Sequence, residues 1–342
     1  MRTCCRVVLC CVWLCAAATL PAVSQEQRFA DLGDFKLESG EVLRDCRIGY
    51  RTFGQLNADK SNVLLLTTWA GGTTEQLAGS VGAGRLADST KYFVILVDAL
   101  SNGVSSSPSN SQSQPHMQFP KITFHDMVAT QYELLTKFLH IDHVKAVMGI
   151  SMGGMQAFQW MVQYPAFMDK AIPIVGSPRV APYDLLHWKT QIDAIKNDPA
   201  WYGGEYTNNP AREAEYEFGA ILLSTPEHFN KTHTREQVLE EIAHAKASSD
   251  GFDANNKIRQ AEAIMALDVS APFGGSMEKA AGQVKATVLV IVDKDDHTVT
   301  PGPAIEFAHL LGAKVLILDD GCGHQYCDYA AVEKAVAEFL GE

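Results

Sequence analysis

The strongest chemical signal in the sequence is a serine held between two glycines. The segment GISMG, residues 149–153, follows a short apolar run at 144–150 and precedes a stretch with helical spacing of apolar residues. A sharp strand-to-helix turn leaves little room for side chains on either flank and lifts the Ser151 hydroxyl above the edge of a sheet. The amide of Met152 and the helix N-terminus then face a developing oxyanion. The context predicts that Ser151 is a nucleophile rather than part of a structural turn.

A serine nucleophile needs a base, and His324 is the best candidate in the chain. It ends the segment DGCGH, residues 320–324, directly after the apolar run at 314–318, and it is the last histidine of the sequence. Flanking glycines let such a loop bring an imidazole back over a sheet, and chain order Ser, acid, His is usual for this type of turn. Hydrogen-bonded to Ser151, the imidazole would take the hydroxyl proton and return it to the leaving group.

The acid that orients this histidine should follow the apolar run at 287–292. Three carboxylates compete there: Asp293, Asp295 and Asp296. The acid usually lies about three residues beyond the strand end, shortly before a Val/Pro pair, and such a pair follows within residues 299–301. Asp296 is therefore favoured, with the other two as alternatives.

A second oxyanion donor should come from the loop after the apolar run at 62–67. That loop reads TWAGG, residues 68–72, and its glycines permit a close approach of backbone to substrate. The backbone amide of Ala70 or Trp69 is the expected donor, with Ala70 slightly favoured. The Trp69 side chain would form either a pocket wall or part of the core.

The elements that must position these residues form an alternating pattern. A hairpin is expected over residues 34–43, and residues 126–139 have apolar positions at helical spacing. Continuous apolar runs suit strands covered on both faces, as in a parallel sheet. We therefore predict an α/β fold with a predominantly parallel, doubly wound sheet. The six apolar runs are residues 62–67, 92–97, 144–150, 171–175, 287–292 and 314–318.

Residues 177–273 break this alternation. The segment contains helix formers, for example at 235–247, and no strand-like run. It predicts a helical cap inserted into a core formed by residues 25–176 and 274–342, and the cap is also the surface through which we would expect a homodimer. The Ser/Asn/Pro-rich stretch 101–115 is either a loop that lines the site or a solvated surface loop.

The first 24 residues have the composition of a secretory signal peptide. Arg2 and Arg6 precede an apolar stretch at 7–20, and small residues lead to a cleavage site near Ser24. The alternative is a membrane anchor, but 14 apolar residues fall short of the roughly 20 that span a bilayer. We expect a secreted or periplasmic protein without a stable membrane span.

The charge excludes two classes of partner. The net charge is −12, and loss of the two arginines before the cleavage site makes it −12 − 2 = −14. Nucleic acids and anionic membranes are bound by clustered positive charge. We therefore expect a small-molecule acyl substrate and no nucleic acid.

Three cysteines remain after the predicted cleavage: Cys46, Cys322 and Cys327. A disulfide between the last two would clamp the His324 loop, and two free thiols are the alternative. They bracket His324, but no second Cys/His pair completes a zinc site. We expect no metal and no cofactor.

Several stretches of this chain resemble the homoserine O-acetyltransferase-like branch of the α/β-hydrolase superfamily. The likeness covers about residues 31–176 and 284–340 and implies an α/β-hydrolase fold with a triad of Ser151, Asp296 and His324. The matching stretches are VGAGRLADSTKYFV (81–94), FPKITFHDMVATQ (119–131), VMGISMGGMQA (147–157), DDHTVTP (295–301) and the Gly323-His324 pair.

The resemblance also implies a substrate site in the cap. The acetyltransferases of this branch use arginines there and in the pocket to hold an amino-acid carboxylate, and between residues 177 and 230 only Arg179 and Arg212 are available. Because acetyl-CoA is a cytosolic donor, export favours water as the acceptor. The leading hypothesis is an exported hydrolase of an ester or related acyl compound, acting through an acyl-Ser151 intermediate. The alternatives are an O-acyltransferase with an acyl-CoA donor and a non-catalytic ligand binder on a hydrolase scaffold.

Overall fold

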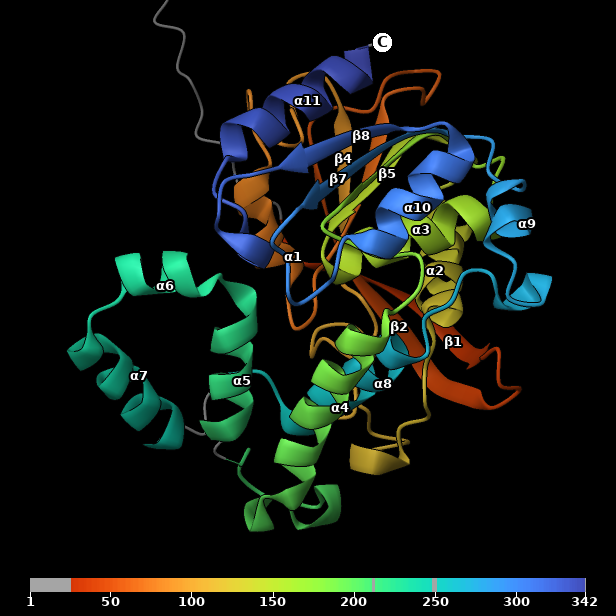
Figure 1. The fold of residues 1–342 in the computed structure, drawn as a ribbon. Coiled ribbons are helices and arrows are strands. Elements are labelled where there is room, and N and C mark those ends of the chain that lie inside the picture. The colour runs from red at the N-terminus through yellow and green to blue at the C-terminus, as the bar shows by residue number, and fades with distance from the viewer. Residues whose placement is uncertain (1–25, 211–212, 248–250, 342) are drawn as a thin grey trace, which may run out of the picture.

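A single mixed sheet organises the molecule. The computed structural model describes residues 26–210, 213–247 and 251–341 (Figure 1). The eight strands lie in the order β1-β2-β4-β3-β5-β6-β7-β8. The first two pairings in this order are antiparallel and the others are parallel, as the continuous apolar runs predict. The strands are β1 (Arg28–Lys36), β2 (Val42–Phe53), β3 (Val63–Thr67), β4 (Phe93–Val97), β5 (Val144–Ile150), β6 (Met168–Ile174), β7 (Thr287–Asp293) and β8 (Lys314–Leu318).

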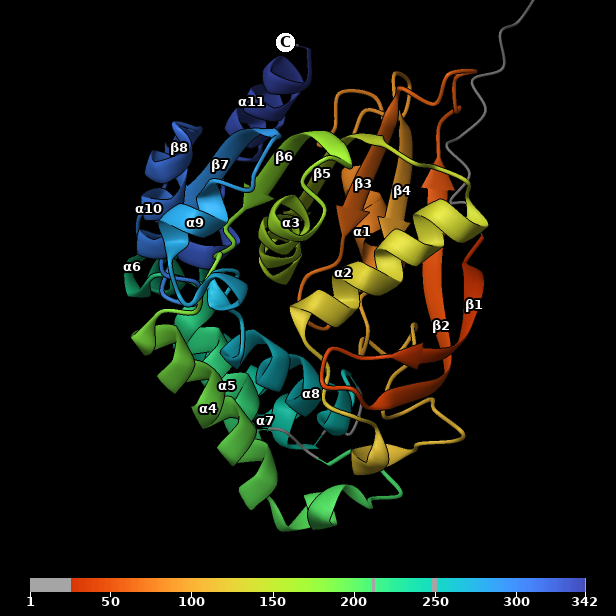
Figure 2. The same cartoon turned by 90° about the vertical axis from the view of Figure 1, so that its right-hand side faces the viewer.

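Helices cover both faces of the sheet, which explains why the strands are apolar without alternation. In β3, Val63 and Leu65 face one hydrophobic core, while Leu64 and Leu66 face the other. Helices α2, α3 and α10 contribute to the first core, and α1 and α11 contribute to the second (Figures 1 and 2). These helices, with the short α9, are α1 (Thr74–Leu77), α2 (Phe124–Glu133), α3 (Met152–Gln163), α9 (Met277–Ala281), α10 (Gly302–Leu311) and α11 (Tyr329–Gly341).

The helix expected over residues 126–139 begins slightly earlier, because Thr123 caps it. The Thr123 hydroxyl accepts the Asp126 amide at 3.3 Å, and the Asp126 carboxylate accepts the Thr123 amide at 2.9 Å. Asp126 also accepts the Glu38 amide at 2.7 Å, which ties the helix to the β1–β2 hairpin. After α2 the chain continues as a π-helical turn, Leu134–Phe138. Two polar positions of the stretch 119–131 therefore serve a capping box and a tertiary contact.

Five further helices follow β6 and precede β7, where the sequence predicts a helical insertion. They lie beyond one end of the sheet, and α8 packs against α4 (Figures 1 and 2). No described helix is long and apolar enough to cross a bilayer. The inserted helices are α4 (Pro182–Asn197), α5 (Glu213–Leu223), α6 (Pro226–Thr232), α7 (Arg235–Ala247) and α8 (Ala254–Met265). Short 3₁₀ turns complete the chain: η1 (Ala78–Ser80), η2 (His116–Gln118), η4 (Pro199–Gly204), η5 (Ala271–Phe273) and η6 (Gly323–Gln325).

The loop over residues 101–115 does not line the cavity around Ser151, and it is solvated only in part. Four of its seven serines are buried and two are exposed. The hydroxyls of Ser105 and Ser106 accept the backbone amides of Gly49 and Arg47, both at 2.9 Å. The loop therefore supplies hydrogen-bond partners to β2, which explains why a polar segment is buried here.

Candidate active site

Ser151 stands at the tight turn between β5 and α3. Its backbone angles are φ +57° and ψ −121°, a strained conformation for a residue with a side chain. A Cβ at Gly149 would lie 2.4 Å from the Gly153 carbonyl carbon, and a Cβ at Gly153 would lie 2.4 Å from the Thr67 carbonyl oxygen. Real Cβ atoms do not approach backbone this closely, so both flanking positions require glycine.

His324 lies in η6 and contacts the serine directly. Its Nε2 is 2.8 Å from Ser151 Oγ, and its Nδ1 is 2.7 Å from Asp296 Oδ2. His324 is 7% exposed and Asp296 is 3% exposed, so the hydrogen bond between them is shielded from water, while the bond to Ser151 is partly buried beside the cavity. The structure thus brings together three side chains that are 28 and 173 residues apart in the chain.

The Asp296 carboxylate has a defined orientation. Its Oδ1 accepts the amides of Thr298 at 2.8 Å and Val299 at 2.9 Å, which leaves Oδ2 for the imidazole of His324. With Nδ1–H donating to this oxygen, Nε2 is free to accept the serine proton. The arrangement can therefore perform general base catalysis.

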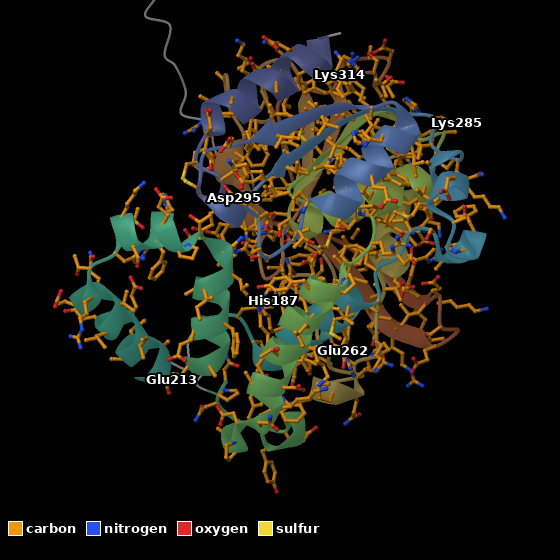
Figure 3. All side chains as sticks on the ribbon, viewed as in Figure 1. His187, Glu213, Glu262, Lys285, Asp295 and Lys314 are labelled. Carbon is orange, nitrogen blue, oxygen red and sulfur yellow. A yellow bond between two sulfur atoms is a disulfide. The ribbon has the colours of Figure 1, made fainter. Side chains whose placement is uncertain are left out.

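The two alternative acids point elsewhere. Asp293 Oδ1 accepts the Asp295 amide at 2.8 Å, and the side chain lies beside Asp320. Burial, with the nearby Asp320 charge as a smaller cause, raises the pKa of Asp293 to about 6. Neither Asp293 nor Asp295 is hydrogen-bonded to His324 among the described residues. Figure 3 labels Asp295, which lies on the core rather than on the inserted helices.

The expected oxyanion donors lie at the same place. Met152 is the first residue of α3, so its amide has no acceptor within the helix. Trp69 and Ala70 line the cavity that contains Ser151. The amide of Gly71 is already used, because it donates to Gln260 at 2.8 Å. The amides of Trp69 and Ala70, which come just before it in the chain, are therefore the candidate donors.

Buried glutamines that the sequence analysis missed hold the two donor segments together. Gln156 Nε2 donates to the Thr68 carbonyl at 3.0 Å and to the Met152 carbonyl at 3.2 Å. Its Oε1 accepts from Gln131 at 2.6 Å, and Gln131 in turn accepts from Trp160 at 2.7 Å. The available signal was a glutamine one turn after the nucleophile in a mostly apolar helix, because such a side chain is buried only with partners.

A cavity of about 890 Å³ opens over Ser151. Its walls come from the core, including His324, and from the inserted helices α4, α5, α6, α7 and α8. Arg179, an expected substrate-binding residue, is half-buried, forms a backbone bridge with Asp268, and is not among the described residues that line this cavity. Arg212, the other expected binder, lies outside the described residues.

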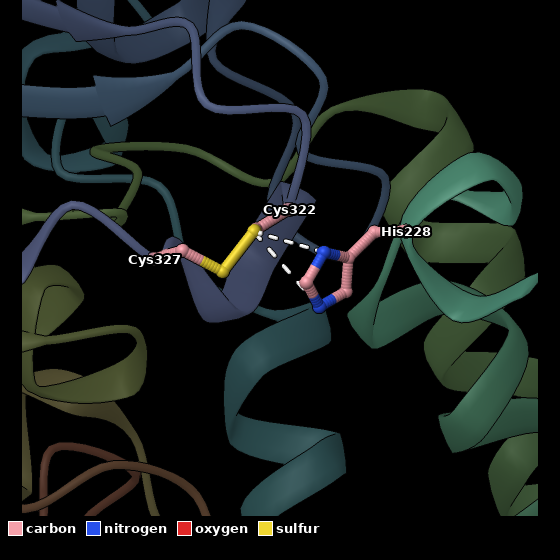
Figure 4. A group of neighbouring side chains, drawn as sticks. All are labelled: His228, Cys322 and Cys327. Atoms are coloured by element: carbon pink, nitrogen blue, oxygen red, sulfur yellow. Dashed lines mark hydrogen bonds between the residues drawn. A yellow bond between two sulfur atoms is a disulfide. The ribbon is translucent and has the colours of Figure 1, made fainter. Parts of the chain in front are cut away.

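Cys322 and Cys327 form a disulfide with an S–S distance of 1.99 Å. The two cysteines lie on either side of His324 in the chain. His228 Nδ1 lies 3.2 Å from Cys322 Sγ (Figure 4). The two sulfurs are bonded to each other and are therefore not thiolates, the form that ligates metals. Cys46 is buried in β2, and burial raises the pKa of its thiol to about 12.

Opening this disulfide should lower activity more than global stability. Because the bond closes only a short loop, it stabilises the fold by about 2 kcal/mol at most through chain entropy. Without the bond, η6 can move, and the His324 imidazole then leaves its position beside Ser151. We expect the double variant Cys322→Ser/Cys327→Ser to lose about tenfold in kcat. A dithiol reductant should slow the parent enzyme and leave the double variant unaffected, and equal effects on both would contradict the prediction.

Comparisons with known proteins place the chain in a family. It matches the family described as alpha/beta hydrolase fold over residues 62–329. An ethyl acetate hydrolase of Pseudomonas veronii is 34% identical over 284 residues, which cover 79% of this chain and 80% of that protein. A homoserine O-acetyltransferase of Pelobacter propionicus is 30% identical over 329 residues, covering 85% of this chain and 87% of that protein.

The fold comparison agrees. The crystal structure of an acetylester hydrolase from Corynebacterium glutamicum matches with a TM-score of 0.87 at 28% identity, covering 93% of this chain and 96% of that one. With its eight-stranded, mostly parallel sheet, the chain is an enzyme of the alpha/beta hydrolase fold family, in the branch that resembles homoserine O-acetyltransferases.

Proposed function

We propose that this enzyme hydrolyses carboxylic esters with short acyl groups through an acyl-Ser151 intermediate. The observation that carries the proposal is the continuous hydrogen-bonded chain from Ser151 Oγ through His324 to Asp296. The similarity to an ethyl acetate hydrolase and to an acetylester hydrolase supports an acetyl ester as substrate.

In the proposed mechanism, Ser151 Oγ attacks the ester carbonyl as its proton passes to His324 Nε2. The negative charge on the carbonyl oxygen is received by the amide of Met152 and by that of Ala70 or Trp69. His324 then protonates the alcohol oxygen, which leaves with both electrons of the broken C–O bond. In deacylation, water attacks the acyl-enzyme in the same way and His324 again transfers the proton. Asp296 holds the imidazole tautomer during both acylation and deacylation.

The cavity chemistry supports water over an acyl-CoA partner. Among the described residues that line it, Lys257 is the sole lysine or arginine, while Glu241 and Glu333 are acidic. A polyphosphorylated donor is bound best by several cations. The similarity to homoserine O-acetyltransferases makes O-acyl transfer the second candidate function.

A substrate comparison tests these two functions. We expect ethyl acetate to be hydrolysed at a rate independent of added homoserine or serine, and acetyl-CoA to be turned over more slowly. Burst kinetics with product analysis would follow both reactions. Acetyl-CoA turnover that depends on an amino-acid acceptor would overturn the hydrolase proposal. Failure of a fluorophosphonate to label Ser151 would instead favour a non-catalytic binder.

We further propose export to a secreted or periplasmic location. The proposed signal peptide, residues 1–24, lies outside the described residues. The support is therefore the sequence pattern alone. Mass determination of the mature N-terminus after expression in the source cell tests it, with cleavage near Ser24 as the expected result.

A further inference from the structure

One helix brings three polar side chains with unused hydrogen-bonding capacity to the wall of the cavity. His187, Trp188 and Gln191 of α4 all line the cavity over Ser151. Their exposed fractions are 6%, 4% and 3%. Five buried side-chain polar atoms in the described chain have no hydrogen-bond partner, and three of them are His187 Nδ1, Trp188 Nε1 and Gln191 Oε1.

The position of these residues follows from the helix and its anchor. His187 and Gln191 are four residues apart, so they lie on the same face, and their side chains contact each other through His187 Nε2. Whichever way the Gln191 amide is turned, one of its polar atoms is left over. At the start of α4, Asp184 accepts the Thr300 amide at 3.1 Å, which fixes the helix to the loop after Asp296.

Buried polar atoms without partners are rare because each costs free energy in the empty protein. When such atoms belong to residues that line a cavity, they point to a ligand that supplies the missing hydrogen bonds. Trp188 Nε1–H can only donate, while the atom left over on Gln191 accepts if it is the oxygen and donates if it is the NH₂ group. A hydroxyl group, which both donates and accepts, can bond either side chain.

The surroundings favour an uncharged group. Tryptophan and glutamine carry no charge, and burial, followed by the nearby charges of Lys257 and His324, lowers the pKa of His187 to about 4. The imidazole is therefore neutral at pH 7. Lys257 already lies over the Trp188 ring, 5.3 Å from its centroid, and has a further interaction.

The subsite lies on the leaving-group side of the reaction. His187 and His324 line the same cavity, and Asp184 at the start of α4 accepts the amide of Thr300 in the loop after Asp296. In the proposed mechanism the alcohol oxygen must lie at His324 to receive its proton. Groups attached to that alcohol therefore extend toward α4.

We propose that His187, Trp188 and Gln191 form a subsite for a hydroxyl group on the alcohol part of the ester, so that monoesters of diols or polyols are preferred substrates. The proposal rests on the proposed ester hydrolysis. It predicts a preference between two esters of equal size, 2-hydroxyethyl acetate and propyl acetate, which differ in a terminal hydroxyl against a methyl.

The test measures kcat/KM for both esters, each divided by its rate of alkaline hydrolysis to remove the difference in intrinsic reactivity. We expect the parent enzyme to prefer 2-hydroxyethyl acetate by about tenfold. Trp188→Phe and Gln191→Met should each reduce this ratio toward one, by slowing the hydroxylated ester more than propyl acetate. Thr190→Val is the matched control, because its hydroxyl bonds the Leu186 carbonyl within α4 and it does not line the cavity.

A ratio near one in the parent enzyme, or a ratio that both subsite variants retain, would overturn the subsite while leaving ester hydrolysis intact. If neither ester is hydrolysed and a fluorophosphonate fails to label Ser151, the proposed function fails and the subsite with it. The parent-enzyme comparison needs no substitution, so it holds even if a variant folds poorly.

Discussion

Replacing Ser151 with alanine should lower ester hydrolysis by at least about 10⁴-fold. The hydroxyl that His324 Nε2 contacts at 2.8 Å would be gone, so no acyl-enzyme can form. Alanine keeps the Cβ at this strained position, so the fold should be retained. Steady-state hydrolysis of ethyl acetate measures the loss of turnover. The intact-protein mass after fluorophosphonate treatment measures the loss of labelling at residue 151.

A second buried serine serves as the control for this variant. Ser106 accepts the Arg47 amide at 2.9 Å and is not among the described residues around the cavity. Ser106→Ala should cost about 1 kcal/mol of stability and keep both turnover and labelling. Retained labelling in Ser151→Ala would mean that another nucleophile reacts, and the site would have to be reassigned.

Exchanging Asp296 for asparagine should reduce kcat on the order of 10⁴-fold without unfolding the protein. In the parent enzyme Oδ1 accepts two backbone amides, so the asparagine would keep its carbonyl oxygen there. Its NH₂ group would then face His324 Nδ1, which must accept rather than donate. The imidazole proton moves to Nε2, and the ring can no longer take the proton of Ser151.

The matched control is Asp293→Asn, which makes the same chemical change three residues away. Asp293 bonds the Asp295 amide and lies beside Asp320 rather than His324. We expect a loss of less than about tenfold in kcat. Thermal unfolding of both variants separates damage to the fold from damage to the site. If Asp293→Asn has the larger effect on kcat, the acid is assigned wrongly.

Sequence reasoning could locate Ser151 because the turn around it depends on local sterics. Gly149 and Gly153 lie where any Cβ would collide with backbone, so their spacing in the sequence indicates the tight turn between strand and helix. The six strands were recognisable for a similar reason, since burial on both faces demands continuous apolar residues. His324 followed from chain order and flanking glycines.

What depends on contacts between distant segments was not predictable. Arg179 looked suitable by charge alone, yet its position relative to the cavity is decided by how the chain leaves β6. The pairing of Cys322 with Cys327 remained one of two alternatives until the loop geometry was known. No local sequence pattern marks Trp188 and Gln191, because what distinguishes them is a buried polar atom without a hydrogen-bond partner, which only the folded structure shows.

The hydrogen bond from the Gly71 amide to Gln260 means that the inserted helices cannot all be exchanged with the same effect, in evolution or in engineering. Gln260 belongs to α8, is fully buried and also donates to the Leu100 carbonyl at 3.1 Å. A chimera that exchanged the whole insertion would thus remove a brace of the loop beside the reacting carbonyl. One that transplanted only α5 to α7 and retained α4 and α8 would remodel the entrance and keep this brace.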